Sequence, residues 1–199
     1  MRFCPGIVFC GERAYNKAEK TEECDMIRAF FLLGDQDLSA ALKIRDEVFV
    51  NEQGFSAELE RDDMDMRAVH AVLEDDDGPC GTARLFFDEG RWHIGRMAVL
   101  KEKRGRGYGD LMLRMMVDKA LNADVDELYV GAQKRAQGFY DKLGFLVCGE
   151  EYLEEGCLHV PMLLTAERAH NVLFGGCGGQ CGACAGCGGC GKKSDGDAE

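Results

Sequence analysis

The sequence predicts an α/β fold of the α+β kind, with a mixed, largely antiparallel central sheet and helices on both of its faces. Three observations favour this fold. Short turns join apolar runs of strand length in the middle of the chain. Segments with apolar residues at helical spacing lie before and after these runs. A hydrophobic share of 46% beside 30% charged residues is typical of a folded globular protein.

The first expected elements begin at residue 26. An apolar run at 26–33 predicts a strand, which ends at Gly34. Asp37 is a suitable N-cap for a helix whose apolar residues recur at helical spacing as far as Phe49. The polar and acidic residues 51–66 predict an irregular loop.

The middle of the chain predicts an antiparallel meander, because its strand-like runs are joined by short Gly-containing turns. These strands are expected at 68–74, 81–88 and 92–100. A glycine-rich loop at 104–109 then opens a helix. The expected elements that follow are a strand at 126–131, a helix at 134–143 that ends at Gly144, and two closing strands at 145–152 and 157–164.

The chain is expected to divide into three parts. Residues 1–25 have few periodic apolar positions and are interpreted as an N-terminal extension. Residues 26–165 carry the expected strands and helices and form the folded domain. Residues 166–199 are rich in glycine and cysteine and are interpreted as a flexible tail.

The charge of the chain limits its partners. A formal net charge of −12 argues against nucleic acid, because a duplex would be repelled by the average field of the protein. No run reaches the roughly 18 apolar residues of a membrane-spanning helix, and the N-terminus has no clear secretory signal. We therefore expect a cytoplasmic protein with no membrane partner, as a monomer or a homodimer.

A local basic patch stands out on this acidic chain. Arg104 and Arg106 belong to a loop that also contains Gly105, Gly107 and Gly109, directly after a strand and before a helix. Glycines let backbone N–H groups approach phosphate oxygens, and the helix N-terminus adds partial positive charge. The loop does not end in Gly-Lys-Ser/Thr and is therefore no Walker loop. A glycine-rich turn that only caps a buried helix remains the alternative.

The surrounding segments resemble a known superfamily. Ile94 to Leu100 followed by the glycine-rich loop looks like the signature of the GNAT superfamily of acyl-CoA-dependent N-acetyltransferases. The segment 131–145 looks like the second signature of that superfamily. The segments 45–53 and 159–162 resemble its ElaA-like bacterial branch. The resemblance covers about residues 26–165, with the motifs in order.

The resemblance implies a binding site for acetyl-CoA. Backbone groups of a strand would pair with the pantetheine arm, and the loop and the start of its helix would hold the diphosphate. The residues implied are Met97, Ala98, Val99, Arg104, Gly105, Arg106, Gly107, Tyr108, Gly109 and Asp110.

The resemblance also implies three catalytic candidates. Tyr140 would protonate the departing CoA thiolate, although packing between helix and sheet is its alternative role. Glu52 would accept a proton at the acceptor end, or else be a solvated loop carboxylate. His159 would orient the acceptor or a water molecule, or serve structure alone. Weaker candidates for the base are Asp62, Asp63 and Asp65.

Further charged residues bear on the acceptor, which is a small-molecule amine or a protein amine. Arg84 and Arg96 lie on strands that should flank the cleft, where each either pairs with an acidic neighbour or meets an anionic acceptor. The acidic stretch 58–65 would favour a cationic acceptor, such as a polyamine or a lysine side chain, if it lined the cleft.

The tail contains four cysteines in a repeated Cys-x-x-Cys pattern. This spacing lets neighbouring thiolates reach a zinc ion or an iron–sulfur cluster. Few apolar residues are present to shield a cluster, so a flexible tail that binds soft metals opportunistically is the alternative. The cysteines are Cys181, Cys184, Cys187 and Cys190.

Two functions follow from these motifs. The first is an N-acetyltransferase that transfers an acetyl group from acetyl-CoA to a primary amine by direct attack. The alternative is a CoA-binding module of the same fold that senses metal or redox state through its cysteine tail.

Overall fold

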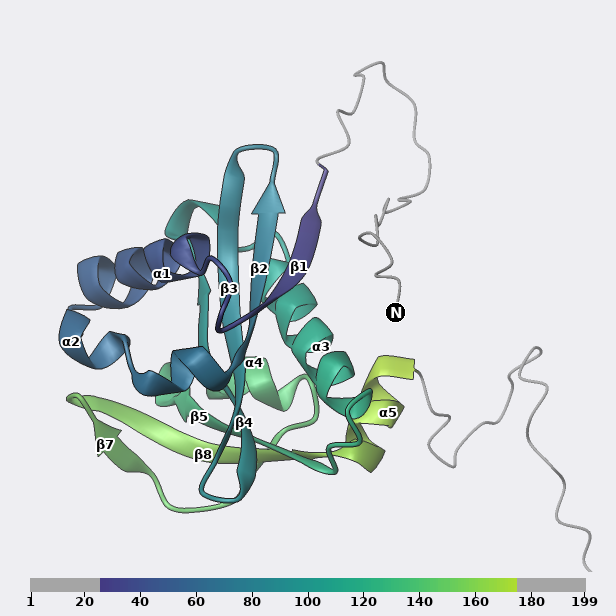
Figure 1. Ribbon diagram of the computed structural model, residues 1–199. Helices are drawn as coiled ribbons and strands as arrows, with labels where there is room; N and C mark the ends of the chain where they lie inside the picture. The colour runs from purple at the N-terminus through teal and green to yellow at the C-terminus, as the bar shows by residue number, and fades with distance from the viewer. Residues whose placement is uncertain (1–25, 175–199) are drawn as a thin grey trace, which may run out of the picture.

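A single eight-stranded sheet runs through the part of the chain that the computed structural model describes, residues 26–174 (Figure 1). Its strand order is β1-β2-β3-β4-β5-β8-β6, and β7 lies beside β8. All neighbouring pairs are antiparallel except β4 and β5. The expected mixed, largely antiparallel sheet is therefore confirmed. The strands are β1 (Arg28–Leu33), β2 (Val69–Asp75), β3 (Gly78–Asp88), β4 (Arg91–Val99), β5 (Glu127–Gln133), β6 (Leu146–Val147), β7 (Tyr152–Glu154) and β8 (Cys157–Thr165).

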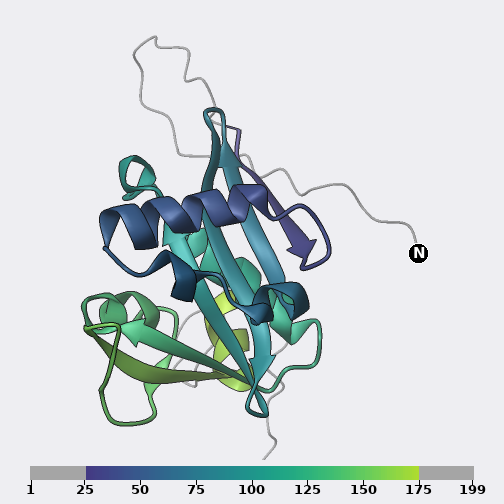
Figure 2. The ribbon, with the colours of Figure 1, turned by 60° about the vertical axis from the view of Figure 1, so that its left-hand side comes forward.

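Helices cover both faces of this sheet, as Figures 1 and 2 show. One face packs against α3, α4 and α5, and its core includes Leu113, Val130 and Met162. The other face carries α1 and η1, whose Ile44 and Val48 pack against β4. The helices are α1 (Ser39–Arg45), the π-helical η1 (Asp46–Glu52), α2 (Ala57–Glu60), η2 (Asp63–Arg67), η3 (Lys101–Lys103), α3 (Tyr108–Leu121), η4 (Lys134–Ala136), α4 (Gln137–Asp141) and α5 (Ala166–Phe174).

Three segments differ from the sequence-based expectation. The expected loop 51–66 contains α2 and η2, because Ser56 and Asp62 cap short helices by accepting hydrogen bonds from backbone N–H groups. The expected strand 145–152 is wrong: Gly149 and two consecutive glutamates interrupt it, which leaves only β6 and the start of β7. Residues 166–174, expected as the start of the flexible tail, form α5, whose Ala169 is buried in the core.

The parallel contact between β4 and β5 is very short. Only Trp92 with Leu128 and His93 with Tyr129 are paired, after which the two strands separate. Figure 2 shows β5 and β8 running away from β4 beyond this point. The remaining residues of β4 therefore present a sheet edge that β5 does not cover.

A β-bulge lies on β4 where the strands have separated. The register with β3 shifts between Thr82 opposite Ala98 and Arg84 opposite Gly95, so β4 carries one extra residue. Arg96 has a φ of 49°, which is rare for a residue with a side chain. The bulge turns Arg96 toward η2 while Met97 packs into the core on the α3 face.

Buried charges hold the segment from α2 to η2 against the sheet. Arg45 is 1% exposed and its Nε donates to Glu60 Oε1 at 2.6 Å, while its Nη1 donates to Asp65 Oδ1 at 2.7 Å. Arg84 Nη1 donates to the same Asp65 oxygen at 2.7 Å. Each buried charge thus has a partner of opposite sign, as burial of charge requires.

Removing the central cation of this network should destabilise the fold. We expect Arg45→Gln to lower the free energy of unfolding by about 3–5 kcal/mol, because it leaves buried carboxylates without their partner. Urea unfolding followed by circular dichroism measures the change. The control is Arg61→Gln, whose 58% exposed side chain pairs with Asp46 and should cost less than about 1 kcal/mol. Equal losses in the two variants would contradict this account.

Candidate active site

A cavity of about 640 Å³ opens where the free end of β4, the glycine-rich loop and α4 meet. Its size is within the usual range of ligand pockets. Nine of the ten residues that the resemblance implies for acetyl-CoA line it, and Arg106 is the exception. The lining residues are Met97, Ala98, Val99, Lys103, Arg104, Gly105, Gly107, Tyr108, Gly109, Asp110, Ala136, Phe139, Tyr140 and Lys142.

The glycine-rich loop has a backbone shape that favours glycine. Gly105 and Gly107 have φ angles of 79° and 85°, in the left-handed region. Gly107 is the N-cap of α3, so the first N–H groups of this 14-residue helix point into the loop without helical partners. The loop therefore offers several N–H donors and the positive end of a helix dipole to one anion.

Lys103 belongs to the basic patch that the sequence predicts, and it anchors the base of this loop. Its Nζ lies 2.7 Å from Asp75 and 2.5 Å from Asp77, both in the hairpin between β2 and β3. The Tyr108 hydroxyl donates to the same Asp75 carboxylate at 3.3 Å. These contacts fix both ends of the glycine-rich loop to the sheet.

Arg104 and Glu52 form a two-fold hydrogen-bonded ion pair at the edge of the cavity. Arg104 Nη1 and Nη2 lie 2.7 Å and 2.5 Å from the two carboxylate oxygens, and Nε donates to the Val99 carbonyl at 2.9 Å. The hydrogen bond from Arg104 lowers the pKa of Glu52. Glu52 is therefore a weaker base in this state than an isolated glutamate would be.

Tyr140 lies in the cavity beside the bulged strand. Its hydroxyl is 3.9 Å from the sulfur of Met97, and its ring packs edge-on against Phe139 and Phe145. Burial raises the pKa of Tyr140 to about 12, so the phenol is protonated at neutral pH. Tyr140 therefore lines the cavity while its ring packs in the core.

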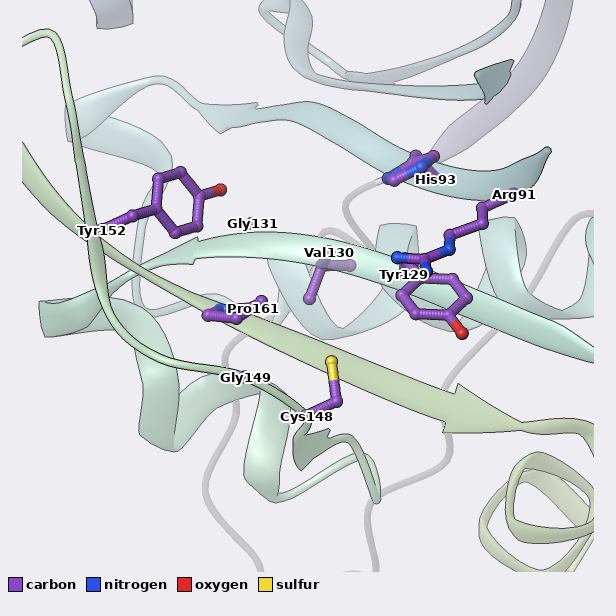
Figure 3. A pocket seen from close by; sticks show the side chains of 9 residues that line it. All are labelled: Arg91, His93, Tyr129, Val130, Gly131, Cys148, Gly149, Tyr152 and Pro161. Atoms are coloured by element: carbon purple, nitrogen blue, oxygen red, sulfur yellow. The ribbon is translucent and has the colours of Figure 1, made fainter. Parts of the chain in front are cut away.

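His159 lies on the opposite face of the sheet from α3. It is 8% exposed, and its Nδ1 is 3.0 Å from the Cys157 carbonyl oxygen. Its Nε2 is 4.0 Å from Glu154, and its ring stacks on Tyr152 at 5.7 Å between centroids. Tyr152 lines a second cavity of about 400 Å³ (Figure 3), whereas His159 does not.

Arg84 and Arg96 pair with acidic neighbours. Arg84 Nη1 lies 2.5 Å from Asp62 Oδ1, and Arg96 Nη2 lies 3.2 Å from Asp62 Oδ2. Arg96 Nε also lies 3.1 Å from Glu60. Burial by itself would raise the pKa of Asp62, but the hydrogen bonds from Arg84 and the charges of Arg84 and Arg96 together lower it, which makes Asp62 a poor base too. The buried carboxylates of the acidic stretch are thus neutralised by arginines, and the expected preference for a cationic acceptor loses its support.

The second cavity contains residues that the sequence reading missed. They lie on β4, β5 and β8, on the loop between β6 and β7, and at the start of β7 (Figure 3). The alternation of side chains along β4 was the available signal, because Arg91 and His93 face away from the core that holds Ile94. The lining residues are Arg91, His93, Tyr129, Val130, Gly131, Cys148, Gly149, Tyr152 and Pro161.

The expectations for the two ends of the chain fall outside the described residues. These are the extension 1–25 and the candidate metal ligands Cys181, Cys184, Cys187 and Cys190. Between residues 26 and 174, Cys80, Cys148 and Cys157 are free thiols. That same stretch contains no group of three or more metal-ligating side chains. Nor does any of its helices have the length and hydropathy needed to cross a membrane.

An open parallel pair of strands beside a glycine-rich helix entrance defines the class of acyl-CoA N-acyltransferases, and comparison with known proteins agrees. The model of the acetyltransferase (GNAT) domain matches residues 33–166. The uncharacterized N-acetyltransferase YjcF of Bacillus subtilis is 31% identical over 138 residues, which cover 69% of this chain and 99% of YjcF. This chain belongs to the GNAT acetyltransferase family.

Solved structures show the same likeness. Escherichia coli ElaA is 28% identical, with a TM-score of 0.63 over 69% of this chain and 99% of ElaA. An acyl-CoA N-acyltransferase from Pseudomonas aeruginosa is also 28% identical, with a TM-score of 0.63. The match covers 69% of this chain and 98% of the Pseudomonas chain. The expected family and fold are confirmed, and with them an enzyme that transfers an acyl group from acyl-CoA to an amine.

A methyl group in the glycine-rich loop should impair CoA binding beyond its effect on the backbone. We expect Gly105→Ala to weaken CoA binding at least tenfold, because the new Cβ stands where the phosphates approach. Isothermal titration with CoA measures the affinity. Gly90→Ala is a matched control, since Gly90 also has a φ of 79° and open space around it but lies in the turn between β3 and β4. Similar CoA affinities in both variants would argue against this location.

Proposed function

We propose that this enzyme transfers an acetyl group from acetyl-CoA to a primary amine by direct attack, with the cosubstrate in the 640 Å³ cavity. The observation that carries the proposal is the meeting of an uncovered strand edge, a glycine-rich helix entrance and a protonated phenol in one cavity. We place the enzyme in the cytoplasm, as a monomer or homodimer acting on a small-molecule or protein amine.

The cosubstrate would lie along β4 and end at the loop. The pantetheine amides would pair with backbone groups of Met97, Ala98 and Val99, which β5 leaves uncovered. The diphosphate would accept hydrogen bonds from the loop between Arg104 and Gly109 and from the first turn of α3. One solved protein of this fold, a GNAT family acetyltransferase from Elizabethkingia anophelis, has acetyl-CoA bound; it is 15% identical, with a TM-score of 0.53.

The chemistry requires a neutral amine and a leaving thiolate. The amine nitrogen forms a bond to the thioester carbon, whose oxygen takes up negative charge near the backbone N–H of Val99. The carbon–sulfur bond then breaks, and Tyr140 donates its proton to the departing sulfur. The proton that the attacking nitrogen loses restores the phenol, so the products are an N-acetyl amine and CoA thiol.

Glu52 takes part through Arg104. In the free enzyme this carboxylate is engaged by the guanidinium, which lowers the pKa of Glu52. A diphosphate that takes over Arg104 removes that hydrogen bond, and the pKa of Glu52 returns toward its ordinary value. The carboxylate is then freed to accept a proton at the acceptor end only when the cosubstrate is bound. His159 supports the acceptor side by stacking on Tyr152.

The sensing alternative depends on the cysteine tail, which lies outside the described residues. No observation between residues 26 and 174 favours it over acyl transfer.

Removing the phenolic hydroxyl tests the acid. We expect Tyr140→Phe to lower kcat by about 10²–10⁴-fold, because proton donation to the leaving group is lost. CoA affinity should change little, since the ring and its packing remain. Mass spectrometry of the N-acetyl product measures the rate, because the eleven cysteines of the chain would react with a thiol reagent. An unchanged kcat would remove Tyr140 from the mechanism.

The pH dependence provides a second test. A general acid works in its protonated form, and burial raises the pKa of Tyr140 to about 12, so the acid persists at higher pH than an ordinary tyrosine. We therefore expect kcat to show no alkaline decline up to about pH 10.5, where an unperturbed phenol of pKa about 10 would be mostly ionised. A decline with a midpoint below about pH 10 would contradict a buried, protonated Tyr140.

A further inference from the structure

The second cavity lies at the closed end of the gap between β4 and β5, on the face of the sheet that carries α1. Side chains alternate along a strand, and Leu128, Val130 and Met162 pack in the core on the α3 face. Tyr129, Gly131 and Pro161 therefore face the other way, together with Arg91 and His93 of β4. Its volume of about 400 Å³ suits a small molecule.

The cavity is lined by flat surfaces. The rings of His93 and Tyr129 lie 5.8 Å apart at 40°, and Tyr152 closes the opposite end (Figure 3). Gly131 makes room for Tyr152, because a Cβ at this position would lie only 2.4 Å from the Tyr152 hydroxyl oxygen. Pro161 contributes an apolar surface beside Gly131. A planar ring fits such surfaces through stacking and edge contacts.

The cation of this cavity is Arg91. Its guanidinium lies 4.9 Å from the centre of the Tyr129 ring, which holds it in place. Within residues 26–174, no carboxylate lies at ion-pair distance from Arg91. Glu127, two residues before Tyr129 on β5, instead accepts a hydrogen bond of 2.8 Å from the Tyr129 hydroxyl. A guanidinium with free donors is suited to a carboxylate.

The register of the strands relates this cavity to the acyl group. His93 is the last residue of β4 that pairs with β5, and Met97 lies four residues further along. At about 3.3 Å per residue, the cavity and the proposed thioester position are separated by roughly 10–13 Å. A molecule seated between Arg91 and Tyr152 can bridge part of this distance and present an amine on a short arm toward Met97.

We propose that the second cavity holds the far end of the acceptor, and that this end is a planar ring bearing a carboxylate. This inference rests on the proposed function, since it gives the acceptor class for the same reaction. The ring lies between His93, Tyr129 and Tyr152, and the carboxylate accepts hydrogen bonds from Arg91. The amine extends along the gap toward the acyl group. The pairing of the acidic stretch with arginines removes the repulsion that such an anion would otherwise meet.

Binding measurements test this acceptor class without requiring turnover. The probes are para-(aminoethyl)benzoate and para-(aminoethyl)benzamide, which share the ring and the arm but differ in charge. Calorimetric titration into the full chain saturated with CoA should show at least about tenfold tighter binding of the benzoate, the gain expected of a charged hydrogen bond. Equal affinity for the two probes, or no binding of the benzoate, would overturn the inference.

Variants locate the binding site. Arg91→Gln should remove the preference for the benzoate and leave the affinity for the benzamide nearly unchanged. The control is Arg28→Gln, because Arg28 is also an exposed arginine on a strand. Its side chain on β1 is 65% exposed and pairs with Glu74 of β2. It should retain the preference. If Arg91→Gln keeps the preference as well, the benzoate binds elsewhere and the inference is wrong.

Turnover separates this inference from the proposed function. Acetylation of the benzoate with a KM at least about tenfold below those of the benzamide and of spermidine supports both. If spermidine is acetylated and the benzoate is not, the acetyltransferase proposal stands and the acceptor class fails. If CoA does not bind at all, the proposed function fails, and benzoate binding that requires Arg91 would still identify the cavity as a site for aromatic carboxylates.

Discussion

The early separation of β4 from β5 is the constraint on which the rest of the site depends. A parallel pair normally continues as a ladder, because each unpaired strand edge leaves backbone groups without partners. Here the ladder ends at His93 and Tyr129, and the bulge at Arg96 turns β4 further from its neighbour. β5 remains in the sheet because seven residue pairs join it to β8. β5 therefore lacks backbone hydrogen bonds on one side only. The gap creates both cavities, one toward α3 and the other toward the loop between β6 and β7.

Buried charges hold the two margins of this gap. On one margin, Lys103 ties the glycine-rich loop to the hairpin between β2 and β3. On the other, Arg45 and Arg84 tie the segment from α2 to η2 to the sheet through Asp65. Such pairs are costly to desolvate, but once buried they permit few alternative arrangements, because any shift would leave a charge unpaired. Apolar packing alone would allow the short helices α2 and η2 to slide, since they bury little surface. The paired charges instead fix their position.

The sequence predicted the fold, and it grouped nine residues that line one cavity, because both depend on local patterns. The glycine-rich loop and the strand before it are contiguous, so their shared role could be inferred from neighbouring residues. The sequence did not predict the partner of Glu52, which lies 52 residues from Arg104. For Arg84 and Arg96 it left pairing with an acidic neighbour as one of two alternatives, because the partners lie on other elements. The failed strand at 145–152 had a local warning in Gly149 and the two glutamates. By contrast, the second cavity is assembled from four segments, and only the alternation along β4 pointed toward it.

The local arrangement of charge also explains how an acidic protein can bind anionic ligands. A net charge of −12 repels anions at long range, but this field is screened over about 10 Å in salt solution. At the cavities the relevant groups are guanidiniums and oriented N–H donors. In the proposed complex Arg104 would meet the diphosphate while already held by Glu52, so binding would exchange one anion for another. Arg91 has no such competitor among the described residues and is held by a neutral ring. The two proposed sites therefore differ in kind: the cosubstrate would displace an internal carboxylate, whereas an anionic acceptor would enter a site where the cation is already free.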